Sequence, residues 1–148
     1  MTLLVPFDGS TLSTAALEKA SEHAELTDED VVAVTIVPDD GDYARERGWI
    51  QDHEQFDPDV VVRKMRNIVD SVAPEATFRH EIVDSDEPTA TSTTNVVRTI
   101  RDVAADVDAD VVFVGSENAG SVTTPLSSVG GPVASDQQYD VYVVRHAD

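Results

Sequence analysis

Residues 2–10 read TLLVPFDGS, and this stretch decides the fold. Its apolar run at residues 3–5 is typical of a strand that is buried on both faces of a parallel sheet. Pro6 then removes a donor from the hydrogen-bond ladder, and Asp8 places a carboxylate at the carboxyl end of the strand. The Gly-Ser pair that follows permits a tight turn and a helix N-cap. Because ligands of open α/β sheets bind beyond the carboxyl ends of the strands, Asp8 is the first residue predicted to have a function.

The rest of the chain alternates between strand-like and helix-like segments. Apolar runs and helical spacings predict strands at residues 31–37, 77–83, 110–115 and 141–144, and helices near residues 10–26, 57–73 and 94–104. Strands that alternate with helices form parallel β/α units with right-handed crossovers. The sequence therefore predicts an α/β fold with a five-stranded, doubly wound parallel sheet and helices on both faces.

The hydrophobicity of the strands predicts their places in the sheet. The least hydrophobic strand, residues 77–83, is expected at an edge, and the first strand near the centre. The first and fourth strands would then lie side by side, which brings Asp8 close to Gly115 at the switch point. His80, on the apolar face of the edge strand, is expected to be partly buried and hydrogen-bonded, because no second histidine or carboxylate lies nearby at metal-ligand spacing.

Residues 38–55 form the least regular part of the chain and contain its only tryptophan, Trp49. A segment this long between elements is often functional, so one interpretation is a lid or a partner contact. The other interpretation is a short helix whose tryptophan covers the edge of the core. The sequence leaves both open.

The composition restricts the partners. The chain has 148 residues, with 29 acidic and 10 basic side chains and a net charge of -19. This length allows one domain with a real core, expected over residues 1–148. A surface so negative repels nucleic-acid phosphates and anionic lipids, so no nucleic-acid or membrane partner is expected. The chain contains no cysteine, which excludes disulfides, thiolate metal sites and cysteine nucleophiles.

The acidic residues are spread along the whole chain, and lysine occurs only at Lys19 and Lys64. This pattern resembles proteins adapted to high intracellular salt, where charges are screened over about 3 Å at 1 M. It predicts a halophilic archaeon as the source. No run of about 18 apolar residues and no basic-then-apolar signal segment is present, so a cytoplasmic location is expected.

The segment after the fourth strand, residues 115–129, reads GSENAGSVTTPLSSV. Its glycines and hydroxyls, with the backbone N–H groups, are typical of a loop that holds phosphate oxygens. The segment matches neither the GxGxxG fingerprint nor the P-loop, and it contains no lysine. By itself this pattern is a weak indication of a nucleotide site.

These motifs together carry a resemblance to a known family. LLVPFDGS, followed in order by SxxAL, DVVFVGS, SSV and VYVVR, makes the whole chain similar to the universal stress protein family. The resemblance implies a Rossmann-like, adenine nucleotide alpha hydrolase-like fold with strand order 3-2-1-4-5. It also implies a homodimer through the last strand, in which Val141 or Val143 would be buried.

The resemblance also implies a nucleotide site. In ATP-binding members of the family, a carboxylate at the tip of strand one recognises the adenine, and a residue near the end of strand two adds a backbone contact. A loop of the form G-x2-G-x9-G-S/T-V holds the ribose and the phosphates. By position, the resemblance assigns cofactor binding to Pro6, Asp8, Ile36, Gly115, Asn118, Ser127, Ser128 and Val129.

The chain departs from the family's loop at two of its three glycines, which are replaced by Asn118 and, after a one-residue deletion, by Ser127. Asparagine tolerates positive φ, but a serine Cβ obstructs a close approach to phosphate. Glu117 adds a negative charge at the place where a triphosphate would lie. This charge repels the triphosphate unless Mg²⁺ lies between them. A Gly-Gly-Pro segment at residues 130–132 interrupts the helix that would follow.

Three functions are compatible with these observations. The favoured one is a non-catalytic stress-response or regulatory protein with weak or lost ATP binding, which needs no cofactor. The alternative is an ATP-binding switch with slow hydrolysis, which uses ATP with Mg²⁺. An enzyme on the same fold is disfavoured, because the 4 histidines are scattered and the sequence indicates no triad or metal cluster. Asp8 itself has a second interpretation, as a turn residue that bonds its own backbone.

Overall fold

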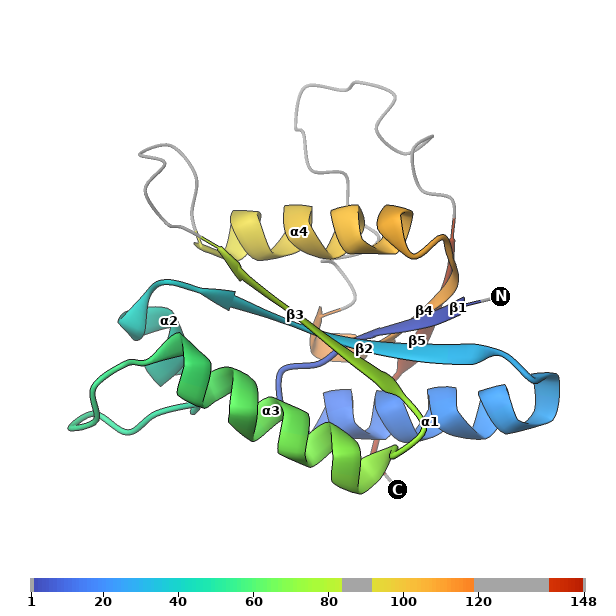
Figure 1. Ribbon diagram of the computed structural model, residues 1–148, viewed down its shortest axis with the longest axis horizontal. Helices are drawn as coiled ribbons and strands as arrows, with labels where there is room; N and C mark the ends of the chain where they lie inside the picture. The colour runs from blue at the N-terminus through green and yellow to red at the C-terminus, as the bar shows by residue number, and fades with distance from the viewer. Residues whose placement is uncertain (1, 84–91, 119–138, 148) are drawn as a thin grey trace.

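The computed structural model describes residues 2–83, 92–118 and 139–147 (Figure 1). Its strands form one 5-stranded parallel sheet in the order β3-β2-β1-β4-β5, as predicted. The strands are β1 (Thr2–Pro6), β2 (Asp30–Pro38), β3 (Thr77–Val83), β4 (Ala109–Gly115) and β5 (Asp140–Val144). The opening stretch of the sequence therefore forms the central strand, between β2 and β4.

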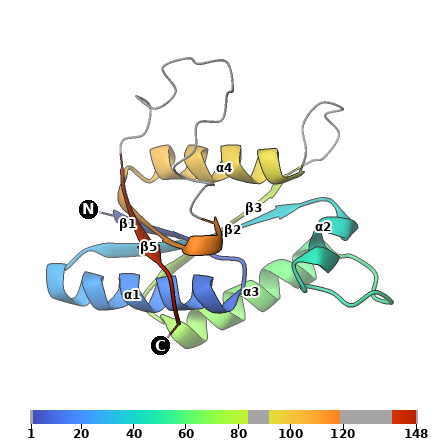
Figure 2. The ribbon, with the colours of Figure 1, turned by 180° about the vertical axis from the view of Figure 1, so that it is seen from behind.

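Helices cover both faces of the sheet. They are α1 (Thr11–Thr27), α2 (Gly41–Glu46), α3 (Pro58–Val72) and α4 (Ser92–Asp106), and a short 3₁₀ helix, η1 (Ser116–Asn118), follows β4. In Figure 1, α1 and α3 lie below the sheet and α4 lies above it, and Figure 2 shows the same layers from behind. The predicted doubly wound α/β fold is confirmed.

The burial of β1 explains why the sheet forms around the opening sequence. Leu3 and Val5 are 0% exposed and enter the core beneath α1 and α3, and Leu4, also 0% exposed, enters the core beneath α4. Alternate side chains of a strand point to opposite faces, so a strand covered by helices on both sides must be apolar throughout. Burying each of these side chains stabilises the fold by about 1.5–3 kcal/mol relative to leaving it exposed.

Local side-chain bonds fix the helix starts at the carboxyl edge of the sheet. Ser10 caps α1, because its hydroxyl accepts a hydrogen bond from the Ser13 N–H at 3.2 Å. Asp57 caps α3 by accepting from the Asp59 N–H at 3.0 Å, and Pro58 occupies the first turn. Both starts agree with the predicted helices.

The edge strand β3 differs from its prediction at His80. A partly buried, hydrogen-bonded histidine is predicted, and this is wrong: His80 is exposed, with its ring stacked near Phe78 at a centroid distance of 6.2 Å. Because β3 is an edge strand, the helices cover only part of its face. Ile82, two residues further along the strand, is accordingly 45% exposed.

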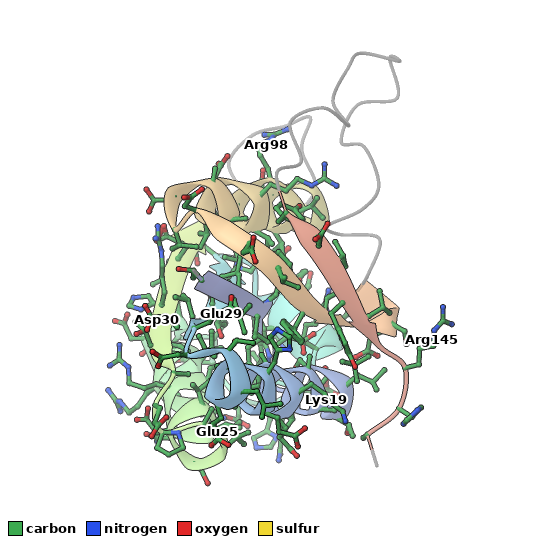
Figure 3. All side chains as sticks on the ribbon, turned by 90° about the vertical axis from the view of Figure 1, so that its right-hand side faces the viewer. Lys19, Glu25, Glu29, Asp30, Arg98 and Arg145 are labelled. Atoms are coloured by element: carbon green, nitrogen blue, oxygen red, sulfur yellow. The ribbon has the colours of Figure 1, made fainter. Side chains whose placement is uncertain are left out.

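Charged side chains cover the outside of the molecule (Figure 3). The labelled Lys19, Arg98 and Arg145 project away from the sheet into the surroundings. None of the helices within the described ranges combines the length and the apolar composition that a membrane span requires.

Candidate functional site

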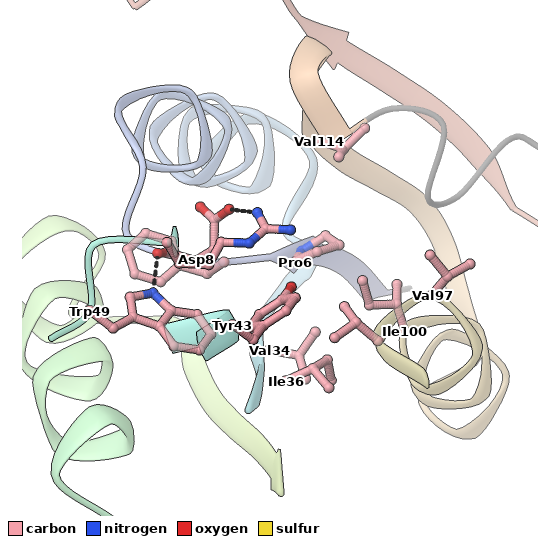
Figure 4. A pocket seen from close by; sticks show the side chains of 12 residues that line it. Pro6, Asp8, Val34, Ile36, Tyr43, Trp49, Val97, Ile100 and Val114 are labelled. Atoms are coloured by element: carbon pink, nitrogen blue, oxygen red, sulfur yellow. Dashed lines mark hydrogen bonds and ion pairs between the residues drawn. The ribbon is translucent and has the colours of Figure 1, made fainter. Parts of the chain in front are cut away.

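A pocket lies where the carboxyl ends of β1, β2 and β4 meet the first half of α4 (Figure 4). Most of its wall is aliphatic, from Pro6, Val34, Ile36, Val97, Ile100 and Val114. The polar part of the wall comes from Asp8 and from residues 41–49, here called the α2 region, which contributes Tyr43, Arg47 and Trp49. The cavity volume is about 40 Å³, which is room for a few water molecules.

Asp8 is the acidic side chain of this site. Its Oδ1 accepts from the Ser10 N–H at 3.0 Å, and its Oδ2 accepts from Arg47 Nη1 at 3.0 Å. Burial by itself raises the pKa of the Asp8 carboxyl. Hydrogen bonds from Ser10 and Ser13 and the positive charge of Arg47 outweigh burial and hold this pKa below its usual value. The carboxylate is therefore ionised at neutral pH.

The turn after β1 depends on the same carboxylate. Oδ1 of Asp8 bonds the backbone two residues further along, and Gly9 between them has φ 80°. Glycine adopts this left-handed conformation without strain. The interpretation of Asp8 as a turn residue that bonds its own backbone is therefore confirmed. The turn uses Oδ1, and the ion pair with Arg47 uses Oδ2.

The α2 region folds over the end of β1. Trp49 Nε1 donates to the Asp8 carbonyl oxygen at 2.8 Å, and Trp49 is 5% exposed. The Trp49 carbonyl oxygen in turn accepts from Lys64 Nζ at 3.1 Å, which ties this region to α3. The short helix α2 and the buried indole confirm the second interpretation of residues 38–55, in which Trp49 covers the edge of the core.

Tyr43 and Arg47 belong to the site, but no motif identifies them in the sequence. The Arg47 guanidinium lies 4.9 Å from the centroid of the Tyr43 ring, which is a cation–π contact. Burial raises the pKa of the Tyr43 hydroxyl, with Arg47 opposing the change, so the phenol is neutral at pH 7. The one sequence signal that Tyr43 and Arg47 are neighbours is their spacing of four residues. Residues i and i+4 lie side by side on the surface of a helix.

The structure brings part of the predicted site together. Pro6, Asp8 and Ile36, which come from β1, the turn after it and β2, line the same pocket. The three residues are therefore placed so that one ligand in the pocket can contact all of them. The ligand contact itself stays a prediction.

Gly115 has a packing role at the end of β4. A Cβ added at this position would lie 2.7 Å from the Leu12 Cβ of α1, so the close approach of α1 to β4 requires a glycine here. The β4 residue that lines the pocket together with Asp8 is Val114, and the closeness of Gly115 to Asp8 stays a prediction. Asn118 is the last residue of η1. The other predicted loop contacts lie outside the described residues; they are Ser127, Ser128 and Val129.

The chemistry available in the pocket is hydrogen bonding and charge pairing. Its ionisable side chains, among the residues that the structure describes, are Asp8, Tyr43 and Arg47, and Arg47 contacts both of the others. No group of three or more histidine or carboxylate side chains that could hold a metal ion occurs within residues 2–83, 92–118 and 139–147. The described side chains of the pocket can bind a polar group, and no nucleophile with an adjacent base occurs among them.

A sequence profile of the universal stress protein family matches residues 1–145. The chain belongs to the universal stress protein family. The matched range contains the β1 tip that carries Asp8 as well as β5, so the resemblance seen in the opening and closing motifs is confirmed. No curated protein matches the sequence at a significant level.

Solved structures of universal stress proteins share this fold. UspA from Lactobacillus plantarum is 21% identical, with a TM-score of 0.55 over 98% of this chain and 97% of that chain. A universal stress protein from Archaeoglobus fulgidus, solved in complex with dAMP, is 17% identical, with a TM-score of 0.55 over 97% and 96%. A third universal stress protein structure, solved in complex with cAMP, is 20% identical, with a TM-score of 0.51 over 100% of this chain and 98% of that chain. At these identities the likeness establishes the shared fold, and the bound nucleotides are properties of those relatives.

Proposed function

We propose that this universal stress protein is a non-catalytic stress-response or regulatory protein whose ATP binding is weak or lost. The observation that carries the proposal is the ion pair between Asp8 Oδ2 and Arg47 Nη1, at 3.0 Å. By the family resemblance, Asp8 is the residue that would recognise an adenine. Here a side chain of the same chain already binds one of its oxygens. An adenine N–H that bonds this oxygen must share it with Arg47 or displace the guanidinium.

The size of the pocket supports the same proposal. Small-molecule sites typically have volumes of about 300–1,000 Å³, whereas this cavity has about 40 Å³. Tyr43 and Trp49, 8% and 5% exposed, fill the α2 side of it, and Arg47 lies over the Tyr43 ring. The residues present therefore do not fit an adenine ring in this arrangement. No reaction step that uses ATP is part of the proposal.

The sequence of the loop after β4 adds a second argument. Asn118 and Ser127 stand where the family's ATP-binding members have glycines, and any Cβ limits how closely a backbone approaches a phosphate. Glu117 brings a further negative charge to the same loop. The adenine part and the phosphate part of the predicted site thus both differ from those of the ATP-binding members, and both differences favour weaker binding of ATP.

An ATP-binding switch that uses ATP with Mg²⁺ is the alternative. It is supported by the pocket wall, in which Pro6, Asp8 and Ile36 occur together, and by the solved relatives in complex with dAMP and cAMP. In this alternative Arg47 leaves Asp8 when the nucleotide enters. The two side chains are 31% and 19% exposed, and the nucleotide must then supply contacts that replace their ion pair.

We also propose that the protein forms a homodimer through β5. This strand lies at the edge of the sheet, and Tyr142 is 47% exposed although its ring stacks on Phe113 with 4.9 Å between centroids. Val141 and Val143 are half-buried, so a partner strand would complete their burial and cover the free edge. The cytoplasmic location and the halophilic source stay predictions from the composition.

Calorimetry of ATP binding with Mg²⁺ at molar salt tests the proposed function. We would compare the wild type, Asp8→Ala, and Asp70→Ala as a control that removes an exposed carboxylate from α3. Weak or lost binding predicts no binding heat at micromolar ATP for any of the three proteins. Micromolar binding that is present in the wild type and in Asp70→Ala but lost in Asp8→Ala would establish the ATP-binding switch instead.

A further inference from the structure

A second hollow, here called the groove, lies on the other side of the wall formed by Asp8, Arg47 and Trp49. These three residues line both the pocket described above and the groove, which opens between the turn before α1 and the side of α3. The volume of the groove is about 430 Å³, within the range of roughly 300–1,000 Å³ that is typical of small-molecule sites.

The groove is cationic in a protein that is strongly negative. Arg47 and Lys64 line it, and the one acidic side chain in its described wall, Asp8, is bound by Arg47. The chain has only 10 basic side chains against 29 acidic ones, and Lys64 is one of its two lysines. Two cations that converge on one hollow are therefore an exception to the charge pattern of the surface.

Both cations are held in place by bonds that leave further donors for a ligand. Lys64 Nζ donates to the Trp49 carbonyl oxygen at 3.1 Å, and Arg47 Nη1 donates to Asp8 Oδ2 at 3.0 Å. An ammonium has three N–H donors and a guanidinium has five, in a planar fork that suits carboxylate and phosphate oxygens. Side chains that are fixed before binding lose less entropy when a ligand arrives.

The α3 side of the groove is partly apolar. Met65 is 4% exposed and Ile68 is half-buried, and Asn67 lies beside them in the groove wall. We propose that the groove binds a small organic oxyanion. Its carboxylate or phosphate group would contact the two cations, and its carbon skeleton would lie on Met65 and Ile68.

This site is separate from the one on which the proposed function depends. Gly9, Lys64 and Asn67 line the groove and not the pocket, whereas Val97 and Ile100 line the pocket and not the groove. Binding of an oxyanion in the groove needs no nucleotide in the pocket. The two proposals can therefore fail independently, and signals from these two sets of residues distinguish them.

An NMR titration with inorganic phosphate and, separately, with butyrate tests the site, at an ionic strength kept constant with sodium chloride. We expect saturable shifts of the Gly9 and Asn67 amides and none at Val97. Lys64→Met should lower the affinity by at least about tenfold, because it removes one of the two charged donors. Lys19→Met removes the other lysine of the chain, from α1, and should leave the affinity unchanged.

Lys64→Arg keeps the charge and is expected to retain binding, which separates loss of the cation from damage to the fold. The proposal is overturned if the Gly9 and Asn67 shifts fail to saturate with both anions, or if wild type and Lys64→Met bind equally well. It is also overturned if the shifts are confined to Val97, because the anion would then occupy the pocket.

Discussion

The pocket and the groove share a wall but have opposite properties. The pocket has a volume of about 40 Å³ and a mostly aliphatic lining, whereas the groove has about 430 Å³ and two cations. Arg47 neutralises the Asp8 carboxylate at the pocket and, together with Lys64, leaves the groove with a net positive charge. A few residues of the α2 region therefore decide which side of the β1 tip is open to a ligand.

The largest effect is expected from removing the wall between the two hollows. Trp49→Ala deletes a side chain that is 5% exposed, and with it the hydrogen bond to the Asp8 carbonyl oxygen. Truncating a buried aromatic residue lowers the free energy of unfolding by about 3–5 kcal/mol, and here it would also join the pocket to the groove. Urea unfolding at constant molar salt measures the loss.

Leu26→Ala is the control for that substitution. Leu26 is 87% exposed, so its truncation should change the free energy of unfolding by less than about 0.5 kcal/mol. A cost for Trp49→Ala no greater than that of the control would mean that the indole is not part of the core and does not separate the two hollows.

A smaller and pH-dependent effect is expected from the charge of Asp8. Asp8→Asn keeps an Oδ1 acceptor for the turn but loses the ion pair with Arg47, so at pH 7 it should lower the free energy of unfolding by about 1–2 kcal/mol. The folded-state pKa of Asp8 lies below its usual value. Its ionised form therefore stabilises the fold above the unfolded-state pKa of about 3.9, and this stability is lost as the pH falls through the folded-state pKa.

Urea unfolding of the wild type and Asp8→Asn from pH 7 to pH 3 measures this dependence. The difference between the two proteins should stay level down to about pH 4 and then shrink. A difference that stays the same over the whole range would show that the charge of Asp8 contributes no stability and that the ion pair does not hold the wall in place.

The frame of the site could be predicted from the sequence, because its signals are local. The apolar run at residues 3–5 predicts the central strand. The family resemblance adds the strand order that places the ends of β1 and β2 together, and the structure has Asp8 and Ile36 at one pocket. The ion pair of Arg47 with Asp8 could not be predicted. It joins positions 39 residues apart, and the chain reaches it through a segment with no regular hydrophobic pattern.

Two further features of the structure could not be predicted, for a related reason. The exposure of His80 depends on how far the helices extend over an edge strand, and the need for a glycine at position 115 depends on the approach of Leu12 from α1. Both are set by the packing of elements that lie far apart in the chain. A pattern within one strand or one loop carries no information about such packing.

The affinity of Arg47→Gln for adenosine tests the claim that Arg47 closes the pocket. Adenosine has no phosphate, so any attraction between Arg47 and a phosphate does not enter the measurement. The control is Arg45→Gln, because Arg45 lies in α2 and pairs with Asp42 instead of Asp8. If Arg47 closes the pocket, Arg47→Gln binds adenosine at least about tenfold more tightly than the wild type, and Arg45→Gln binds like the wild type. Equal or weaker binding by Arg47→Gln would contradict that claim.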